Sequence, residues 1–304
     1  MKHRFQTALL VLPAFAFAML FNSCSNDDGT KGPGDSTPDS TQTGSTDSAA
    51  NKDLPTGVPS PSEMFAFMKA AGNTKGDGSL LNPVDNEKKY SSKKAESLNL
   101  GIYSADLLYC STFNVSAQVA SYFGVCMRMG TTLNVATSLT EKDKDRIGKN
   151  AGNGDSLVSI SNDLYLSSFE NLENNQRGAD LSLMLAGGWV ESLYLMSSMV
   201  KDFDKDQAIA GRIADQKLSL ENLIDFMAIP ENSNSDVVAV SGQLKELKAM
   251  MDEIKTSDNQ AGGMQIKNGK RVLGGGSKPA ITKDQFEKIK AKIIEIRNGF
   301  INAQ

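Results

Sequence analysis

The stretch Ala95-Glu-Ser-Leu-Asn-Leu-Gly-Ile-Tyr-Ser-Ala-Asp-Leu-Leu-Tyr-Cys110 decides the fold of this chain. Its apolar residues form two stripes at helical spacing, the first with Ala95, Leu98, Ile102, Ala105 and Tyr109 and the second with Leu100, Tyr103, Leu107 and Cys110. A line of serines occupies the remaining side. Because apolar side chains cover most of its girth, the helix expected over about 90–113 lies at the centre of its domain.

Asp106 interrupts this apolar surface. It lies roughly 160° from the serine line, at about 100° per residue, and so points toward the apolar side. A buried carboxylate must be paired, hydrogen-bonded or protonated, and Arg128 on the next helix or a tyrosine hydroxyl could satisfy it. Two interpretations stay open: a structural hydrogen bond, which we favour, or a ligand-facing acid in a pocket with Tyr103 and Trp189.

Helical periodicity recurs on both sides of this stretch. Ser60-Pro-Ser-Glu63 and Thr282-x-x-Gln285 resemble capping boxes, which begin helices. We expect about eight or nine helices, over roughly 60–71, 90–113, 114–133, 156–172, 178–201, 204–229, 237–254 and 282–300, with a short charged one near 140. Short connections between them predict one all-α domain over 60–304, a bundle of stacked antiparallel helical hairpins.

A second long helix, over 178–201, carries the sequence Ala186-Gly-Gly-Trp189. Each glycine weakens a helix by about 1 kcal/mol relative to alanine, so a neighbouring helix is expected to approach closely there, with Trp189 packed beside it. Glu191 shares a side with Asp180 and Ser198 and is expected on a polar or solvated face. Gly187 on that side could open a groove.

One β element is expected before the last helix. Asn268-Gly269 lies between runs of β-forming residues, which is the strongest short hairpin signal. Glycines bracket it on both sides. We therefore predict a two-stranded flap over 262–276.

The N-terminal residues predict an export signal. Lys2 and Arg4 precede an apolar run that is too short and too early to span a membrane, and Cys24 follows. The residues before Cys24 resemble the loose lipobox of Bacteroidetes lipoproteins, and Asp27–Asp28 resembles the surface-export signal of that group. We expect 1–23 to be removed and Cys24 to be acylated, an anchor that several acyl chains make stable. An ordinary secretory signal with an incidental cysteine is the alternative.

Residues 24–59 form a tether rich in Ser, Thr, Asp, Gly and Pro. With almost nothing apolar to bury, such a segment is expected to be disordered. Three Asp-Ser/Thr-small triplets in it resemble the O-glycosylation motif of Bacteroidetes proteins, with acceptors at Ser36, Ser40 and Ser48. A chance result of the composition is equally compatible with them.

Composition excludes several function classes. His3 is the only histidine and leaves with the signal, so the mature chain lacks His-based acid–base catalysis, Ser-His and Cys-His nucleophile pairs and most zinc sites. Acidic runs lack the spacing of a calcium loop. The mature chain keeps 30 basic and 36 acidic residues, a net charge of −6, which argues against a nucleic-acid partner. No enzyme, cofactor or metal is expected.

Cys110 and Cys126 are expected to be small core residues rather than a disulfide. If the chain reverses near Asn114, the two lie about 12 Å apart along antiparallel helices, at ~1.5 Å per residue. A disulfide needs Cα atoms within about 7 Å.

A family resemblance adds the location. Leu100-Gly-Ile-Tyr-Ser-Ala-Asp-Leu-Leu-Tyr109 together with Ala186-Gly-Gly-Trp-Val-Glu-Ser-Leu-Tyr194 resembles a group of uncharacterised all-helical Bacteroidetes lipoproteins. The resemblance covers the helical domain up to the flap and implies an all-helical fold at the outer membrane, on its periplasmic face or on the cell surface, with the surface slightly favoured. It implies no activity.

Two functions follow as expectations. The first is a non-catalytic lipoprotein that binds another envelope protein or scaffolds an envelope assembly. The second is a small-molecule or glycan-binding lipoprotein, with a pocket near Tyr103, Asp106 and Trp189.

Overall fold

The computed structural model describes residues 57–73, 75–135, 141–150, 153–255, 264–267, 270–273 and 281–304. The expected signal peptide, the acylated Cys24 and the tether with Ser36, Ser40 and Ser48 all lie outside these residues. They stay predictions.

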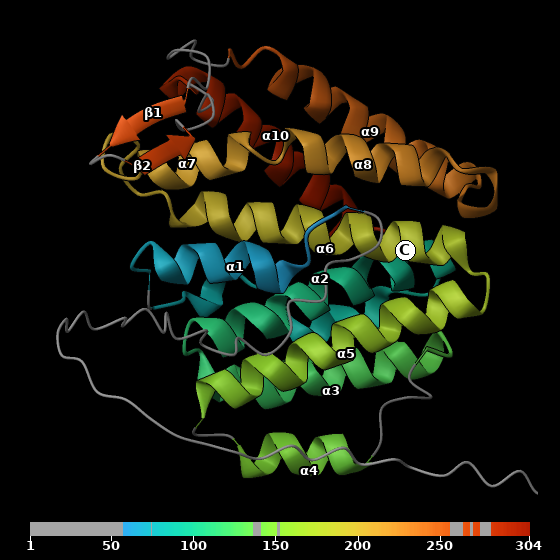
Figure 1. The fold of residues 1–304 in the computed structure, drawn as a ribbon. Helices are drawn as coiled ribbons and strands as arrows, with labels where there is room; N and C mark the ends of the chain where they lie inside the picture. The colour runs from blue at the N-terminus through green and yellow to red at the C-terminus, as the bar shows by residue number, and fades with distance from the viewer. Residues whose placement is uncertain are drawn as a thin grey trace, which may run out of the picture. The chain divides into compact units, whose positions relative to one another are not determined.

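Within these ranges the chain forms ten α-helices, and the prediction of an all-helical body is confirmed (Figure 1). They are α1 (Pro61–Ala70), α2 (Lys93–Thr112), α3 (Ser116–Thr132), α4 (Glu141–Lys149), α5 (Gly154–Asn174), α6 (Gly178–Met199), α7 (Gln207–Ala214), α8 (Lys217–Ala228), α9 (Ser235–Asp252) and α10 (Lys283–Ile301). Three short 3₁₀ turns join some of them: η1 (Gly78–Leu80), η2 (Val84–Lys89) and η4 (Pro230–Asn232).

Several helices begin where the sequence indicates. Both capping boxes are present: the Ser60 hydroxyl accepts from the Glu63 N–H while Glu63 accepts from the Ser60 N–H, and Thr282 and Gln285 do the same at α10. The single helix expected over 204–229 is wrong, because the chain breaks at Asp215 and Gln216 into α7 and α8. Neither residue is a glycine or proline, so the sequence carries no signal of that break.

A short antiparallel pair precedes α10. β1 (Met264–Lys267) pairs with β2 (Lys270–Leu273), with Met264 opposite Leu273. The helical body itself holds no strand among its described residues. The two residues between the strands and the segments that flank them lie outside the described ranges, so the expected flap stays a prediction.

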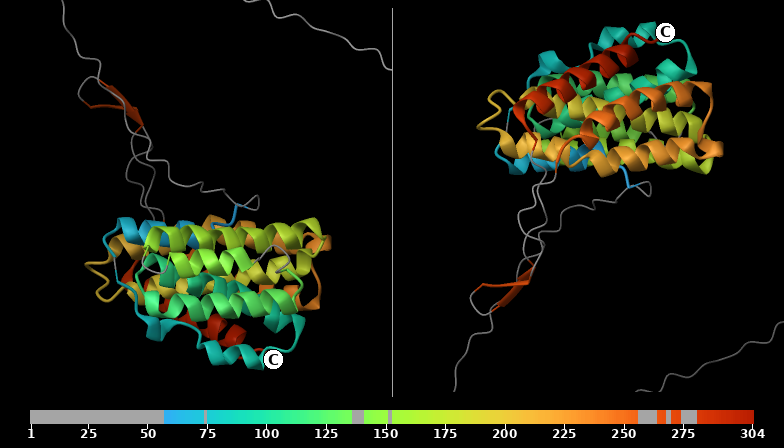
Figure 2. Two further views of the ribbon diagram at one scale, coloured as in Figure 1. Left: turned by 90° about the horizontal axis from the view of Figure 1, so that it is seen from below. Right: turned by 90° about the horizontal axis from the view of Figure 1, so that it is seen from above.

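Helices α2 and α6 form the centre of the body (Figures 1 and 2). On one side α3 and α5 pack against α2, and on the other α7, α8, α9 and α10 pack against α6. Glu96 interacts with Asp180 near the two N-termini, and Asp106 meets Glu191 further along. The central helices therefore run side by side in the same direction.

Glycines allow this central contact. A Cβ at Gly101 would overlap the carbonyl oxygen of Met184, and one at Gly187 would overlap that of Leu98. The predicted close approach of a helix to the glycines of α6 is confirmed, and Trp189 beside them is buried. Gly187 does not open the groove that the sequence allowed, since the backbone of α2 occupies that position.

The two cysteines behave as predicted from geometry. Cys110 and Cys126 are both buried and both free thiols. Burial raises the pKa of Cys126 to about 12 and that of Cys110 further still, so both thiols stay protonated.

Candidate functional site

A cluster of ionisable side chains lies in the core where α2, α6 and α10 meet. Asp106 and Glu191 are fully buried, and Arg297 is 6% exposed. The Arg297 guanidinium donates two hydrogen bonds to the Glu191 carboxylate, from Nε to Oε2 at 2.7 Å and from Nη2 to Oε1 at 2.9 Å. It also lies 4.0 Å from the centroid of the Tyr194 ring. These contacts make the pair a bidentate, desolvated ion pair.

Asp106 completes the cluster as a second acid. The charge of Glu191 acts on its carboxyl, and its Oδ2 accepts from the backbone N–H of Asn82 at 3.2 Å. Its Oδ1 finds no donor among the residues that the structure describes. Burial, and then the charge of Glu191, raise the pKa of Asp106 well above its ordinary value. Burial also raises the pKa of Glu191, against the opposing effect of Arg297.

The connection between η1 and η2 is drawn into this cluster. Asn82 is fully buried, and its carbonyl accepts from the Tyr122 hydroxyl at 3.0 Å. Its side chain donates to the Tyr90 hydroxyl at 3.0 Å. On either side, Arg297 donates to the carbonyl of Leu80 at 3.1 Å and the Tyr103 hydroxyl to that of Pro83 at 2.8 Å. A buried connection needs such partners for its backbone, and here side chains supply them.

The C-terminal end of α10 is fastened by the residues around the start of α2. The Asn99 side chain donates to the carbonyl of Phe300 at 3.0 Å, and the Tyr90 hydroxyl donates to that of Ile301 at 3.3 Å. The last carbonyls of a helix have no partner within it, so these bonds satisfy them. Together with Arg297, they join the two ends of the domain.

The structure brings two of the three predicted site residues together. Asp106 and Tyr103 both bond to the connection between η1 and η2, Asp106 at Asn82 and Tyr103 at Pro83. Trp189, by contrast, lies about 200° around α6 from Glu191, at ~100° per residue. Trp189 is buried, and its ring N–H has no partner in the described part of the chain. The indole is therefore core packing beside the glycines, away from the acid cluster.

Two expectations about these charges are wrong. Arg128 does not pair with Asp106, because it pairs instead with Glu87 at 2.8 Å. Glu191 is not on a solvated face, because α10 covers that side of α6 and supplies Arg297. A helical wheel shows only what a helix exposes on its own and cannot show what a distant segment lays over it.

The sequence did contain a signal for this pair. Arg297 follows Ile293 by four positions and precedes Phe300 by three, so it occupies a position of the apolar stripe of its own helix. Glu191 is the one charged residue in the stretch 181–199. Two opposite charges, each set in a buried stripe, are candidates for one another.

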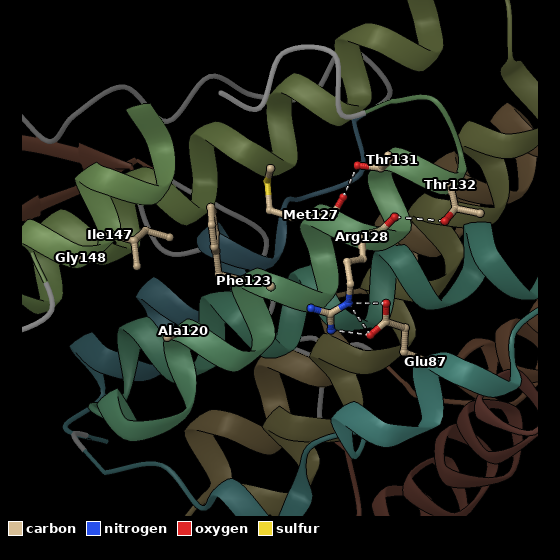
Figure 3. A pocket seen from close by; sticks show the side chains of 10 residues that line it. Glu87, Ala120, Phe123, Met127, Arg128, Thr131, Thr132, Ile147 and Gly148 are labelled. Atoms are coloured by element: carbon tan, nitrogen blue, oxygen red, sulfur yellow. Dashed lines mark hydrogen bonds and ion pairs between the residues drawn. The ribbon is translucent and has the colours of Figure 1, made fainter. Parts of the chain in front are cut away.

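The second candidate is a groove at the surface between α3 and α4, of about 810 Å³ (Figure 3). Phe123 and Met127 rise from α3 toward Ile147 of α4 and give it an apolar floor. Arg128 and Glu87 close one side, with the Arg128 side chain 61% exposed and Glu87 19%. We call this the α3–α4 groove.

One nitrogen of the Arg128 guanidinium, Nη1, lies on the groove side and can still donate a hydrogen bond there. Its Nε and Nη2 bond to the Glu87 carboxylate. Its Nη1 takes part in none of these bonds and lies beside Gly124, 3.2 Å from where a Cβ would stand. A guanidinium held flat by one carboxylate can thus still donate to an acceptor placed over Gly124.

Two further features of the described residues bear on function. Their acidic and cysteine side chains form no group of three or more that could hold a metal ion. None of the helices in these ranges is both long and apolar enough to cross a membrane.

No protein-family model matches the chain, and no curated protein or solved structure matches it at a significant level.

Proposed function

We propose that this protein is a non-catalytic lipoprotein, anchored at the outer membrane by acyl chains on Cys24, that binds an apolar segment of another envelope protein in the α3–α4 groove. The observation that carries the proposal is the groove itself. Its volume of about 810 Å³ is that of a binding site, and its floor of Phe123, Met127 and Ile147 is apolar.

The exposed face of α3 fits a protein partner. In this 17-residue helix the residues that face outward are uncharged except for Arg128: Ser116, Ala117, Ala120, Ser121, Thr131 and Thr132. Small side chains let a second segment lie close, and the groove beside them takes its apolar residues, as in helix-in-groove recognition. The donor of Arg128 can meet one carbonyl of that segment and set its register.

A rigid body supports this assignment. The core cluster fastens α10 and the connection at Asn82 to the central helices, so α3 stands on a fixed platform. Binding surfaces on rigid elements lose less conformational entropy when they bind. The tether would carry this platform at a distance from the membrane, of the order of 30 Å for a flexible chain of its length.

The alternative function receives no support from the geometry. A ligand pocket at Tyr103, Asp106 and Trp189 would need the three side chains to face one space. Instead, Tyr103 donates to Pro83, Asp106 accepts from Asn82, and Trp189 lies on another side of α6 from the acid cluster.

Substitution in the groove tests the proposal. Ala120 is exposed on α3 and lines the groove, so Ala120→Glu places a charge over its apolar floor without disturbing the core. Ala208→Glu, at an exposed alanine of α7, is the matched control. After crosslinking in cells and purification of the lipidated chain, we expect Ala120→Glu to lose a stoichiometric envelope partner that the wild type and Ala208→Glu retain. Equal recovery from all three would refute the groove as the site.

A further inference from the structure

The acid cluster holds an unequal number of charges. Two carboxyl groups, Asp106 and Glu191, are buried with one guanidinium, Arg297. We propose that Asp106 and Glu191 hold one proton between them in the folded body. This proton helps to hold α10 in place, because it keeps the buried cluster around Arg297 neutral.

A hydrogen bond between the two buried acids needs such a proton. A carboxylate has acceptors only, so two ionised carboxylates cannot bond to each other, whereas a protonated acid donates to an ionised one. With both acids ionised, the cluster would carry a net charge of −1 in the core, which is costly. With one proton it is neutral.

The geometry assigns the proton to Asp106. Glu191 already accepts two N–H groups from Arg297, and these favour its ionised form. Asp106 accepts one backbone N–H at Oδ2, and in the described part of the chain its Oδ1 meets no donor. A proton on Oδ1 gives that oxygen a partner by donating to Glu191. In agreement with this assignment, burial and then the charge of Glu191 raise the pKa of Asp106 well above its ordinary value.

The other groups around the cluster stay neutral. The tyrosines and cysteines of α2, α3, α6 and the preceding connection that sense Asp106 all have a raised pKa, mainly because they are buried: Tyr90, Tyr103, Tyr109, Cys110, Tyr122, Cys126 and Tyr194. Among the described groups that act on Asp106, Glu191 and Arg297 carry the charges. The charge of the cluster therefore depends on a single proton.

The sign of the pH dependence follows. In the unfolded chain an ordinary aspartic acid ionises near pH ~3.9, whereas in the folded body Asp106 keeps its proton to a higher pH. Its contribution to stability is full below the unfolded pKa and is lost as pH rises through the folded pKa. Above that, two carboxylates face Arg297, and the hold on α10 and on the Leu80 carbonyl weakens.

Asp106→Asn tests this in the full-length chain. The amide has the shape of the protonated acid, donates an N–H to Glu191 and still accepts from Asn82, so the variant holds a permanent equivalent of the proton. We expect the unfolding constant of the wild type, relative to that of Asp106→Asn, to rise by up to about tenfold per pH unit above the unfolded pKa. Asp155→Asn, whose side chain is 90% exposed, should follow the wild type at every pH. Parallel profiles for the wild type and Asp106→Asn would overturn the proposal.

Infrared spectroscopy gives a second readout, on the folded protein. We expect the wild type at neutral pH to show the carbonyl band of an un-ionised carboxylic acid, and Asp106→Asn to lack it. A wild-type spectrum without this band would overturn the proposal, whatever the stability of the variant.

Discussion

Replacing Arg297 by methionine should test the core cluster more severely than any other single change. Methionine keeps the apolar stem that packs between α10 and α6 but removes the charge. Glu191, fully buried, would then have no cation, and the Leu80 carbonyl would lose its donor. Removing one partner of a buried ion pair costs about 3–5 kcal/mol, because the remaining charge stays desolvated. The lost hydrogen bond adds about 1 kcal/mol.

Such a loss is a large fraction of the 5–15 kcal/mol by which a domain is stable. Urea unfolding followed by circular dichroism, at neutral and at acidic pH, measures it. We expect the deficit of Arg297→Met to be largest at neutral pH and to shrink in acid, because protonation of Glu191 removes the uncompensated charge. A simple loss of packing would instead give a deficit that does not change with pH.

The double variant Glu191→Gln with Arg297→Met is the internal control. With a protonated Asp106 it holds no buried charge, so it should recover most of the stability lost in Arg297→Met alone. A deficit below about 1 kcal/mol for the single variant, the value of an exposed ion pair, would refute the reasoning. A double variant no more stable than Arg297→Met would refute it as well.

Three further predictions concern the frame around the cluster. Gly101→Ala should destabilise the body by about 1–3 kcal/mol or more in urea unfolding, since its Cβ meets the backbone of α6. Gly211→Ala, whose Cβ meets nothing within 4 Å among the described residues, should stabilise the body by up to about 1 kcal/mol. Thr282→Ala should cost about 1 kcal/mol by the loss of the α10 cap, again in urea. Thiol titration of the lipidated chain should find Cys110 and Cys126 unreactive until urea unfolds it, after which both react; reaction in the native state would contradict their burial, and a third reactive thiol would mean that Cys24 carries no lipid.

What the sequence could predict was largely local. The caps at Ser60 and Thr282, the central position of α2 and the close approach at the glycines of α6 follow from patterns within a few turns of one helix, and the structure confirms them. The burial of Asp106 also follows from its position on a wheel.

What the sequence could not predict depends on partners far along the chain. Arg297 is 106 residues from Glu191, and the Asn82 connection reaches Asp106 across a loop without periodicity. Burial of a charge is decided by the segment that covers it, and neither composition nor spacing specifies that segment. The α3–α4 groove was missed for the same reason, since it exists only once α4 stands beside α3.

The most direct test of the proposed function is photo-crosslinking in living cells. A photoreactive amino acid is placed at Ala120, within the α3–α4 groove, or at Ala208 on α7 as the control, and the crosslinked products of the lipidated chain are identified by mass spectrometry. We expect one dominant envelope protein joined to position 120, through an apolar segment, and not to position 208. The same products from both positions, or none from position 120, would contradict the proposed function.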